Sequence, residues 1–377
     1  MKRELSKIGE LATYVNGYAF KPSDWSLKGR PIIRIQDLTG NDYQTNYYES
    51  TLDEKYKIKK GDLLISWSAS IGIYEWDKED AWLNQHIFKV VFDKGVDIEK
   101  KYFQFAVGNA LKKVSGLIHG STMKHLTKSA FDSIQVPLYS VDEQLKIVQR
   151  LEAMQRSVNI SKKEIEKLDT LVKSRFIEMF GDPVMNPMGW EVEGLGKVCD
   201  VRDGTHDSPA YCSEGFPLVT SKNVSSGKID LSDCSYIAKD DYEKINQRSK
   251  VDKGDIIMPM IGTVGIPVIV NFEPNFAIKN VALIKFNSSS AVNNVYIKVL
   301  LESNYFDNAI MRKVRGGTQK FISLGDIRKL QVLVPPIALQ NQFAAFVAQV
   351  DKSKSVLRKL LEKQELLRAA LMQEYFG

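Results

Sequence analysis

Residues 142–180 read DEQLKIVQRLEAMQRSVNISKKEIEKLDTLVKSRFIEMF, a stretch without proline or glycine in which apolar residues recur at every seventh position. Two such ladders interleave along it. The first is Leu151, Val158, Ile165, Val172 and Met179, and the second is Ile147, Met154, Ser161, Leu168 and Arg175. This spacing is the a/d pattern of a coiled coil, so the stretch predicts one helix of ~58 Å at about 1.5 Å per residue.

The same seam occurs a second time towards the end of the sequence. The matching ladders are Val347, Lys354, Leu361, Arg368 and Tyr375, and Phe343, Val350, Leu357, Gln364 and Leu371. Every position lies 196 residues after its counterpart, although Lys354, Gln364 and Arg368 make the second seam more polar. A seam this narrow needs a helical partner. We therefore predict that the two helices pair antiparallel as a rod with one domain at each end, related by a pseudo-twofold axis.

The rest of the chain is duplicated as well, with a period near 190 residues and the order of matching segments kept throughout. The clearest pairs are Asn16-Gly17 with Asp203-Gly204, residues 31–38 with 217–224, Lys60-Gly61-Asp62 with Lys253-Gly254-Asp255, residues 120–124 with 316–320, Val136-Pro137 with Val334-Pro335, Glu143-Gln144 with Asn341-Gln342, and Phe180-Gly181 with Phe376-Gly377. Self-similarity over this length indicates two copies of one structural unit.

Each copy begins with short apolar runs separated by glycine and proline, which are typical of strands of 3–6 residues. Such runs are residues 63–65, 87–92, 268–270 and 282–286, and helical patterns cover 101–114 and 295–314. We predict an α+β fold in which two similar domains are joined by two long antiparallel coiled-coil helices. The predicted parts are residues 1–140, the helical region 141–181, residues 182–336 and the helical region 337–377.

Charge and composition narrow the class of protein. The 377 residues carry a net charge of +6, which permits nucleic acid as a partner. No acidic residue lies between Glu99 and Asp132 or between Asp307 and Asp326, although both windows are rich in lysine and arginine. No signal-peptide pattern or apolar run of membrane-spanning length occurs, so we expect a cytoplasmic protein without a membrane partner. Three cysteines, an odd number, predict neither a disulfide framework nor a zinc site.

Two similar domains at a fixed separation suit a long DNA target with two different half-sites. Candidate DNA-binding residues lie in the duplicated loops and the basic windows. Arg and Lys can pair with guanine and with phosphate, and Gln and Asn can pair with adenine. In the first domain they are Tyr18, Lys21, Arg34, Gln36, Lys112, Lys113, Thr122 and Lys124. In the second they are Thr205, His206, Ser221, Lys222, Asn223, Arg312, Lys313, Arg315, Thr318 and Lys320.

The duplicated plan, the Val-Pro segments that lead into the helices and the Phe-Gly helix ends resemble the specificity subunits of type I restriction–modification systems. Residues 16–25 and 203–209 are similar to the openings of that family's target-recognition domains. The resemblance covers essentially the whole chain, although the first domain has no counterpart to Gly189-Trp190, so we expect its N-terminal edge to be shorter. It implies two target-recognition domains, each reading half of a bipartite site in double-stranded DNA. It also implies helical regions that set the spacer and bind two methyltransferase subunits, with restriction/translocase subunits joining through the complex.

The sequence fits two other classes of protein, an enzyme that acts on DNA and a coiled-coil scaffold, less well. An adenine methyltransferase needs an Asn/Asp-Pro-Pro-Tyr/Phe turn, which Val334-Pro335-Pro336-Ile337 does not provide, and no phosphate-binding loop of an ATP-driven motor occurs. Asp142, Glu143 and Lys146 resemble a nuclease triplet only faintly, and acidic residues favour a helix N-terminus in any case. A coiled-coil scaffold without a nucleic-acid role is the second alternative. We expect no catalytic residue, no metal and no cofactor.

Overall fold

The computed structural model describes residues 3–40, 44–67, 70–118, 127–224, 227–261, 265–287, 289–310 and 321–377. The chain divides into two compact units. The first consists of Met1–Ser161 with Leu360–Gly377, and the second of Lys162–Lys359. Each unit contains one α+β domain and parts of two long helices, α5 (Val141–Phe180) and α12 (Ile337–Phe376).

The first α+β domain runs from β1 to β10. Its elements are β1 (Glu4–Lys7), α1 (Ile8–Leu11), β2 (Thr13–Asn16), η1 (Pro22–Asp24), β3 (Arg30–Ile33), α2 (Ile35–Thr39), β4 (Tyr47–Tyr48), η2 (Glu54–Tyr56), β5 (Lys57–Ile58), β6 (Leu63–Ser66), β7 (Gly72–Glu75), β8 (Ala81–Leu83), β9 (Ile87–Val91), α3 (Lys100–Ile118), α4 (Lys128–Asp132) and β10 (Gln135–Leu138). They form two four-stranded sheets, β2-β9-β6-β7 and β4-β3-β8-β5, and the antiparallel pair β1-β10.

The second α+β domain runs from β11 to β20. Its elements are β11 (Glu191–Gly194), α6 (Leu195–Val198), β12 (Asp200–Asp203), β13 (Tyr211–Cys212), β14 (Phe216–Val219), α7 (Ser221–Val224), β15 (Ser235–Ile237), α8 (Lys239–Ser249), β16 (Ile256–Pro259), β17 (Val268–Ile269), β18 (Ala277–Ile278), β19 (Val281–Lys285), α9 (Asn294–Leu301), α10 (Asn304–Ile310), α11 (Leu324–Arg328) and β20 (Gln331–Val334). Its sheets are β12-β19-β16-β17 and β13-β15-β14-β18, with the pair β11-β20.

The pairing of the strands confirms the predicted α+β fold and its internal duplication. In each domain one sheet is antiparallel throughout, and the other contains a single parallel pair. That pair is β3 with β8 in the first domain, where Ile33 faces Leu83, and β14 with β18 in the second, where Val219 faces Ile278. The copies differ at the edges of these sheets, because β5 occupies one edge in the first domain and β13 one edge in the second.

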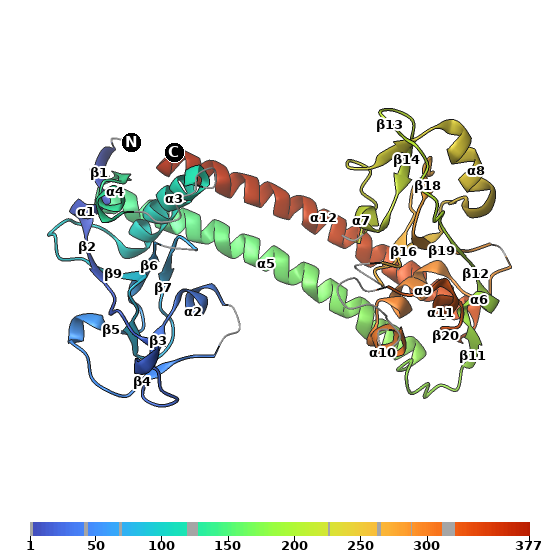
Figure 1. Cartoon of the computed structure of the whole chain (residues 1–377), viewed down its shortest axis with the longest axis horizontal. Coiled ribbons are helices and arrows are strands. Elements are labelled where there is room, and N and C mark those ends of the chain that lie inside the picture. The colour runs from blue at the N-terminus through green and yellow to red at the C-terminus, as the bar shows by residue number, and fades with distance from the viewer. Residues whose placement is uncertain are drawn as a thin grey trace. The chain divides into compact units, whose positions relative to one another are not determined.

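The long helices pack antiparallel within each unit (Figure 1). In the first unit Gln364 donates to the Ser157 hydroxyl at 2.7 Å and accepts from Ser161 at 2.9 Å. In the second unit Lys354 pairs with Asp169 at 2.6 Å. Ser161, Gln364 and Lys354 of the predicted seam therefore have partners, which removes much of the cost of burying them in a coiled-coil interface.

The far end of each helix completes the core of the other repeat's domain. Phe176 and Phe180 of α5 pack on Tyr296 and Phe343 in the second unit, with ring centroids 4.8–5.6 Å apart. Phe376 of α12 lies 5.5 Å from Tyr102 in the first unit. Full burial of such a ring contributes about 1.5–3 kcal/mol. The phenylalanines of the duplicated Phe-Gly ends are thus core residues in both units.

Two sequence predictions are wrong in detail. The match of Glu143-Gln144 with Asn341-Gln342 is out of register by two residues, because Gln340 is the structural counterpart of Gln144. Gln144 accepts from the Glu99 amide and donates to the carbonyls of Asp97 and Tyr139. Gln340 makes the same three bonds, with Asn293, Ala291 and Pro335. Both side chains are fully buried.

The other correction concerns the helix predicted over 295–314. It breaks between α9 and α10, where the Ser303 hydroxyl donates to the carbonyl of Leu300 at 2.6 Å. A serine side chain that bonds the last turn in this way competes with the backbone ladder and ends the helix.

Candidate nucleic-acid interface

Three segments of the first domain meet at one end of its sheets. They are the stretch that follows β2, the start of α2 after β3, and the turn Asn84–His86 between β8 and β9. The amide of Tyr18 donates to the carbonyl of Leu83 at 2.8 Å, and the amide of Gln85 donates to the carbonyl of Tyr18 at 3.0 Å. A side chain at Gly17 would overlap the carbonyl of Asn84, so glycine is required there for the two backbones to approach.

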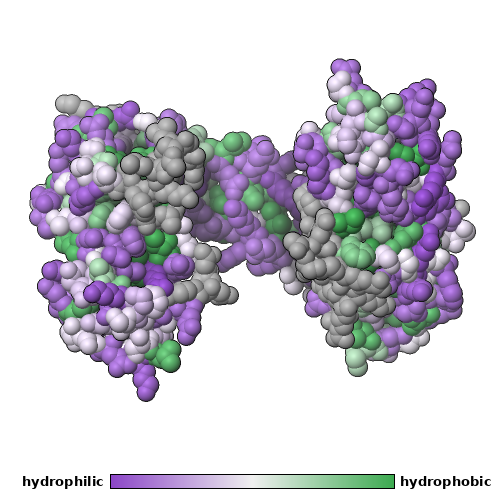
Figure 2. All heavy atoms as spheres, in the orientation of Figure 1, coloured by the Kyte–Doolittle hydropathy of each residue, from purple (hydrophilic) through white to green (hydrophobic). Residues whose placement is uncertain are grey.

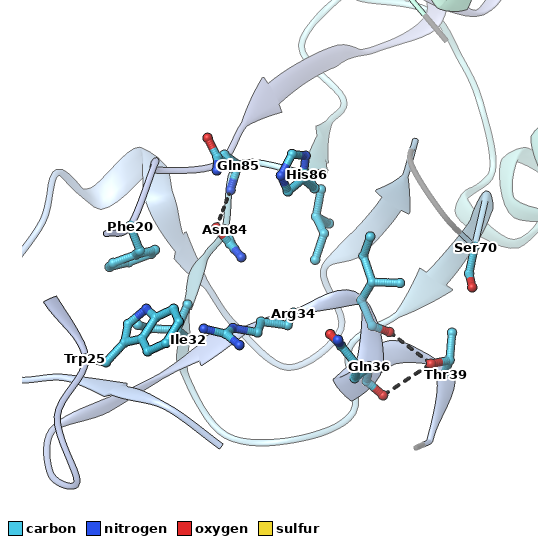
Figure 3. Close-up of a pocket in the computed structure, with 12 residues that line it drawn as sticks. Phe20, Trp25, Ile32, Arg34, Gln36, Thr39, Ser70, Asn84, Gln85 and His86 are labelled. Atoms are coloured by element: carbon cyan, nitrogen blue, oxygen red, sulfur yellow. Dashed lines mark hydrogen bonds between the residues drawn. The ribbon is translucent and has the colours of Figure 1, made fainter. Parts of the chain in front are cut away.

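These segments enclose an open hollow of about 510 Å³ (Figure 3). Aromatic rings, one guanidinium, amides and hydroxyls line it, and the mixture of flat faces with hydrogen-bonding groups suits contact with base edges. The lining residues are Phe20, Trp25, Ile32, Arg34, Ile35, Gln36, Thr39, Ser70, Asn84, Gln85, His86 and Ile87. His86 is notable because its Nδ1 is buried without a hydrogen-bond partner in the described part of the chain, so a bound molecule could supply one.

The second domain repeats this junction with different side chains. The amide of Thr205 donates to the carbonyl of Ile278 at 3.0 Å, and the amide of Asn280 donates to the carbonyl of Thr205 at 3.2 Å. A side chain at Gly204 would overlap the carbonyl of Ile278, just as one at Gly17 would overlap Asn84. The duplicated glycines therefore allow close approach of two segments of protein backbone in both domains.

His206 is the centre of a polar cluster at the second junction. One ring nitrogen lies 2.9 Å from Oδ1 of Asn280, and the other lies 2.8 Å from Oδ2 of Asp203. These two hydrogen bonds raise the pKa of the imidazole above its ordinary value of 6.5. Arg248 pairs with the other oxygen of Asp203, so the carboxylate is held from both sides. The imidazole itself is mostly exposed, which leaves its face open to a partner.

A second hollow of about 360 Å³ lies beside this cluster. It lies between the stretch after β12 and one face of α8, and its charged side chains are of both signs. The lining residues are Thr205, Asp207, Ser208, Pro209, Asp241, Lys244, Ile245, Arg248 and Ser249. The two domains therefore present hollows that begin at equivalent segments but differ in shape and charge.

Most loop residues predicted to bind DNA lie at these two junctions. Arg34 and Gln36 line the first hollow, and Tyr18 packs edge-on against Phe20 beside it. Lys21 is exposed at the start of η1. Thr205 lines the second hollow, and the Ser221 hydroxyl donates to the carbonyl of Asn280 at 3.3 Å.

Two predicted residues of α7 are engaged within the fold. Asn223 is buried, and its side chain bonds Thr220 on one side and the carbonyls of Asp230 and Asp233 on the other. These bonds fix the start of α7. Lys222 lies on the surface, 3.0 Å from Asp233.

Several lysines of the first basic window, residues 100–131, have partners in the structure. Lys100 and Lys101 both pair with Glu75, and Lys113 donates to the carbonyl of Phe376 at 3.0 Å. Lys112, its neighbour, is exposed on α3. An acid-free stretch of sequence therefore does not establish an unpaired patch, since partners come from other segments.

The remaining candidates lie outside the described residues. They are Thr122 and Lys124 in the first domain, and Arg312, Lys313, Arg315, Thr318 and Lys320 in the second.

Sequence reasoning missed three parts of the junctions. They are Trp25, the turn Asn84-Gln85-His86, and the turn Lys279-Asn280. The available signal was position: each turn directly precedes a predicted strand, at 87–92 and 282–286, and each contains an asparagine. Without knowledge of the parallel pairing, nothing in the sequence connected these turns with Gly17 or Gly204.

Comparison with known proteins decides the family. Residues 2–170 and 187–368 match the type I restriction modification DNA specificity domain, so the chain contains two copies of it. The chain belongs to the type I restriction–modification specificity family. A related specificity subunit is that of the type I restriction enzyme EcoBI of Escherichia coli, which is 22% identical and aligns over 98% of this chain and 85% of its own length.

Solved structures support the same fold. The type I restriction–modification S subunit of M. genitalium superposes with a TM-score of 0.55 at 15% identity, over 100% of this chain and 96% of its own. A chain from a study of complex assembly and conformational transition in the type I system gives a TM-score of 0.61 at 14% identity, over 99% and 97%. At these identities the likeness of this specificity subunit to the two structures concerns the fold alone.

The structure also shows the surroundings of the residues that an enzyme or a metal site would use. Asp142 and Glu143 lie in the first turn of α5, where carboxylates complement the helix dipole. Burial raises the pKa of the Cys199 thiol to about 12. Within the part of the chain that the structure describes, no three histidine, cysteine or acidic residues gather as a metal site would require, and no helix could cross a membrane.

Proposed function

We propose that this specificity subunit reads an asymmetric, two-part DNA site, with one half-site for each α+β domain. The reading residues of the first domain are Tyr18, Lys21, Arg34, Gln36, Gln85 and His86. Those of the second are Thr205, His206, Ser208, Ser221, Lys222, Lys279 and Asn280. The cations that would neutralise phosphates are Lys112 and Lys124 in the first domain and Arg312, Lys313, Arg315 and Lys320 in the second.

One observation carries this proposal. The two junctions share a backbone arrangement, from the glycine contact to the parallel strand pair, but almost every side chain exposed on them differs. Where the first domain has Arg34 and Gln36, the second has Thr220 and Lys222. Since bases are read by side chains presented on a common scaffold, equal scaffolds with unequal side chains predict two unequal half-sites.

Domain exchange tests the proposal directly. Residues 1–140 would be replaced by the corresponding domain of another specificity subunit, in cells that carry the partner subunits. The donor domain should have tyrosines at the positions of Tyr102 and Tyr139, because both contact the end of α12. Mapping of methylated positions in the host genome should show one new half-site and one unchanged half-site. A change in both, or in neither, would contradict independent reading.

The long helices are proposed to bind two methyltransferase subunits, through which restriction/translocase subunits join the complex. Several large apolar side chains on α5 and α12 are exposed, and Figure 2 shows hydrophobic surface among hydrophilic residues along these helices. They include Ile160, Leu171, Val356, Leu366 and Leu367. Where such side chains form a contiguous patch, as the neighbours Leu366 and Leu367 begin to do, they mark a surface for a protein partner. Changing Leu366 and Leu367 together to serine should reduce copurification of the methyltransferase, whereas changing the exposed Lys363 to alanine should not.

We further propose that the chain has no catalytic activity of its own. The missing methyltransferase turn and phosphate-binding loop support this. The purified chain, freed of partner subunits, should neither methylate nor cleave DNA that contains its site. Methyl transfer at a stoichiometry above any contaminating partner would overturn the proposal.

A further inference from the structure

Arg34 and Trp25 form a stacked pair at the mouth of the first hollow. The guanidinium carbon of Arg34 lies 4.3 Å from the centroid of the Trp25 ring, and both residues line the hollow (Figure 3). A guanidinium on an indole face has its plane fixed by the ring, so its donor fork points along a defined direction. Trp25 is 43% exposed, so this contact lies at the surface where a partner would approach.

The backbone beneath each residue of the pair is fixed by a carboxylate. The amide of Arg34 donates to Oδ2 of Asp37 at 2.7 Å, which holds Arg34 at the start of α2 directly after the buried strand β3. The amide of Lys21 donates to Oδ2 of Asp24 at 2.7 Å, which shapes the turn η1 that ends at Trp25. The pair is therefore preorganised from both sides.

The equivalent position in the second domain has no cation. Residue 220 is a threonine, and both its amide and its hydroxyl donate to Oδ1 of Asn223, at 3.0 and 2.9 Å. Asn223 thus takes the capping role of Asp37, while the residue at the capped position is a threonine in place of an arginine. The scaffold is the same, and the difference between Arg34 and Thr220 is available for discrimination between half-sites.

Resting on the proposed DNA-reading function, we propose that Arg34 recognises a guanine in the half-site of the first domain and that Trp25 is its positioning residue. A fixed guanidinium fork donates two parallel hydrogen bonds to O6 and N7 of guanine in the major groove, and no other base offers two acceptors in this arrangement. A lysine or a loosely held arginine would more often contact phosphate, which carries no sequence information.

The test uses the assembled complex with its methyltransferase subunits. Arg34→Gln and Trp25→Leu are compared with the wild type by genome methylation mapping and by binding to duplexes in which each position of the half-site is varied. Trp25→Phe retains an aromatic face, and Arg34→Lys retains the charge without the fork. Arg30→Gln is the matched control, because Arg30 stacks on Trp82 at 4.4 Å but does not line the hollow.

We expect Arg34→Gln and Arg34→Lys to lose about tenfold to a hundredfold discrimination at a single G·C pair, with the other half-site unchanged. Trp25→Leu should relax the same pair, Trp25→Phe should largely restore it, and Arg30→Gln should leave it unchanged. Uniform weakening on all sequences, with a shallower salt dependence, would assign Arg34 to phosphate and overturn the inference. So would a wild-type half-site without a G·C pair. A methylated motif that is not in two parts would instead refute the proposed function itself.

Discussion

The two buried glutamines give the most direct test of how the repeats correspond. Gln340 donates to the carbonyls of Ala291 and Pro335, at 3.2 and 2.7 Å, and accepts from the amide of Asn293 at 2.8 Å. Its side chain thus fastens the first turn of α12 to the segment between β19 and α9. Replacing Gln340 with alanine removes all three bonds and leaves three backbone groups to find new partners.

The expected loss follows from these contacts. Each intramolecular hydrogen bond contributes roughly 1 kcal/mol net, and a buried backbone group left without a partner costs about 1–3 kcal/mol. Some of these groups will be reached by water, so we expect Gln340→Ala to lower the free energy of unfolding by about 2–4 kcal/mol. For a cooperative unit of roughly 150–250 residues, 3 kcal/mol corresponds to a fall in Tm of about 6–12 °C. Gln144→Ala should cost a similar amount in the first unit.

Gln342→Ala is the control, because sequence comparison pairs Gln342 with Gln144 although the side chain of Gln342 is exposed. It should change the free energy of unfolding by less than about 0.5 kcal/mol. Thermal unfolding of the full chain measures the loss of unfolding free energy, and hydrogen exchange shows which segment of the chain is destabilised. The amide of Asn293 should exchange faster in Gln340→Ala, while that of Glu99, which is bonded to Gln144, should not. Equal losses for Gln340→Ala and Gln342→Ala would refute the reasoning.

Two further outcomes are expected. Gly17→Ala and Gly204→Ala should each lower the free energy of unfolding by about 1–3 kcal/mol, because the added methyl group meets backbone, and each should disturb only the half-site of its own domain. Gly325→Ala is the control and should not destabilise, because a methyl group has room there. Half-sites that both glycine variants read normally would argue against this. By NMR titration His206 should have a pKa above 6.5, and Asp203→Asn should lower it. Because the folded pKa is raised, the stabilising contribution of His206 is complete below its ordinary pKa and disappears as the pH rises through the folded value; a wild-type midpoint at or below 6.5 would contradict this.

The sequence alone predicted the features that depend on periodicity. The heptad ladders gave the extent of α5 to within one residue, since the prediction began at Asp142 and the helix begins at Val141. They also gave the offset of 196 that aligns Gln144 with Gln340. The segment-by-segment comparison lost this register at the prolines, because Pro137 lies inside β10 whereas Pro335 follows β20. A proline stands out in sequence, but it occupies different structural positions in the two copies.

The candidate site was predicted in part for the same reason. Loops after strands are visible in sequence, so Arg34, Gln36, Thr205 and His206 could be named as candidates for DNA binding, which stays a prediction. The structure shows that these four residues lie at the two junctions. The partners of side chains are not visible in sequence, so the hydrogen bond that Lys113 donates to the carbonyl of Phe376 at the end of α12 could not be predicted.

The sequence by itself therefore determined the duplication, the long helices and the positions of the duplicated loops, since each is a pattern along the chain. Only the tertiary structure decided which glycines touch which turns, where the helix ends are buried, and that Trp25 holds Arg34. These contacts join residues far apart in the chain, and their energies depend on distances that no spacing along the sequence records.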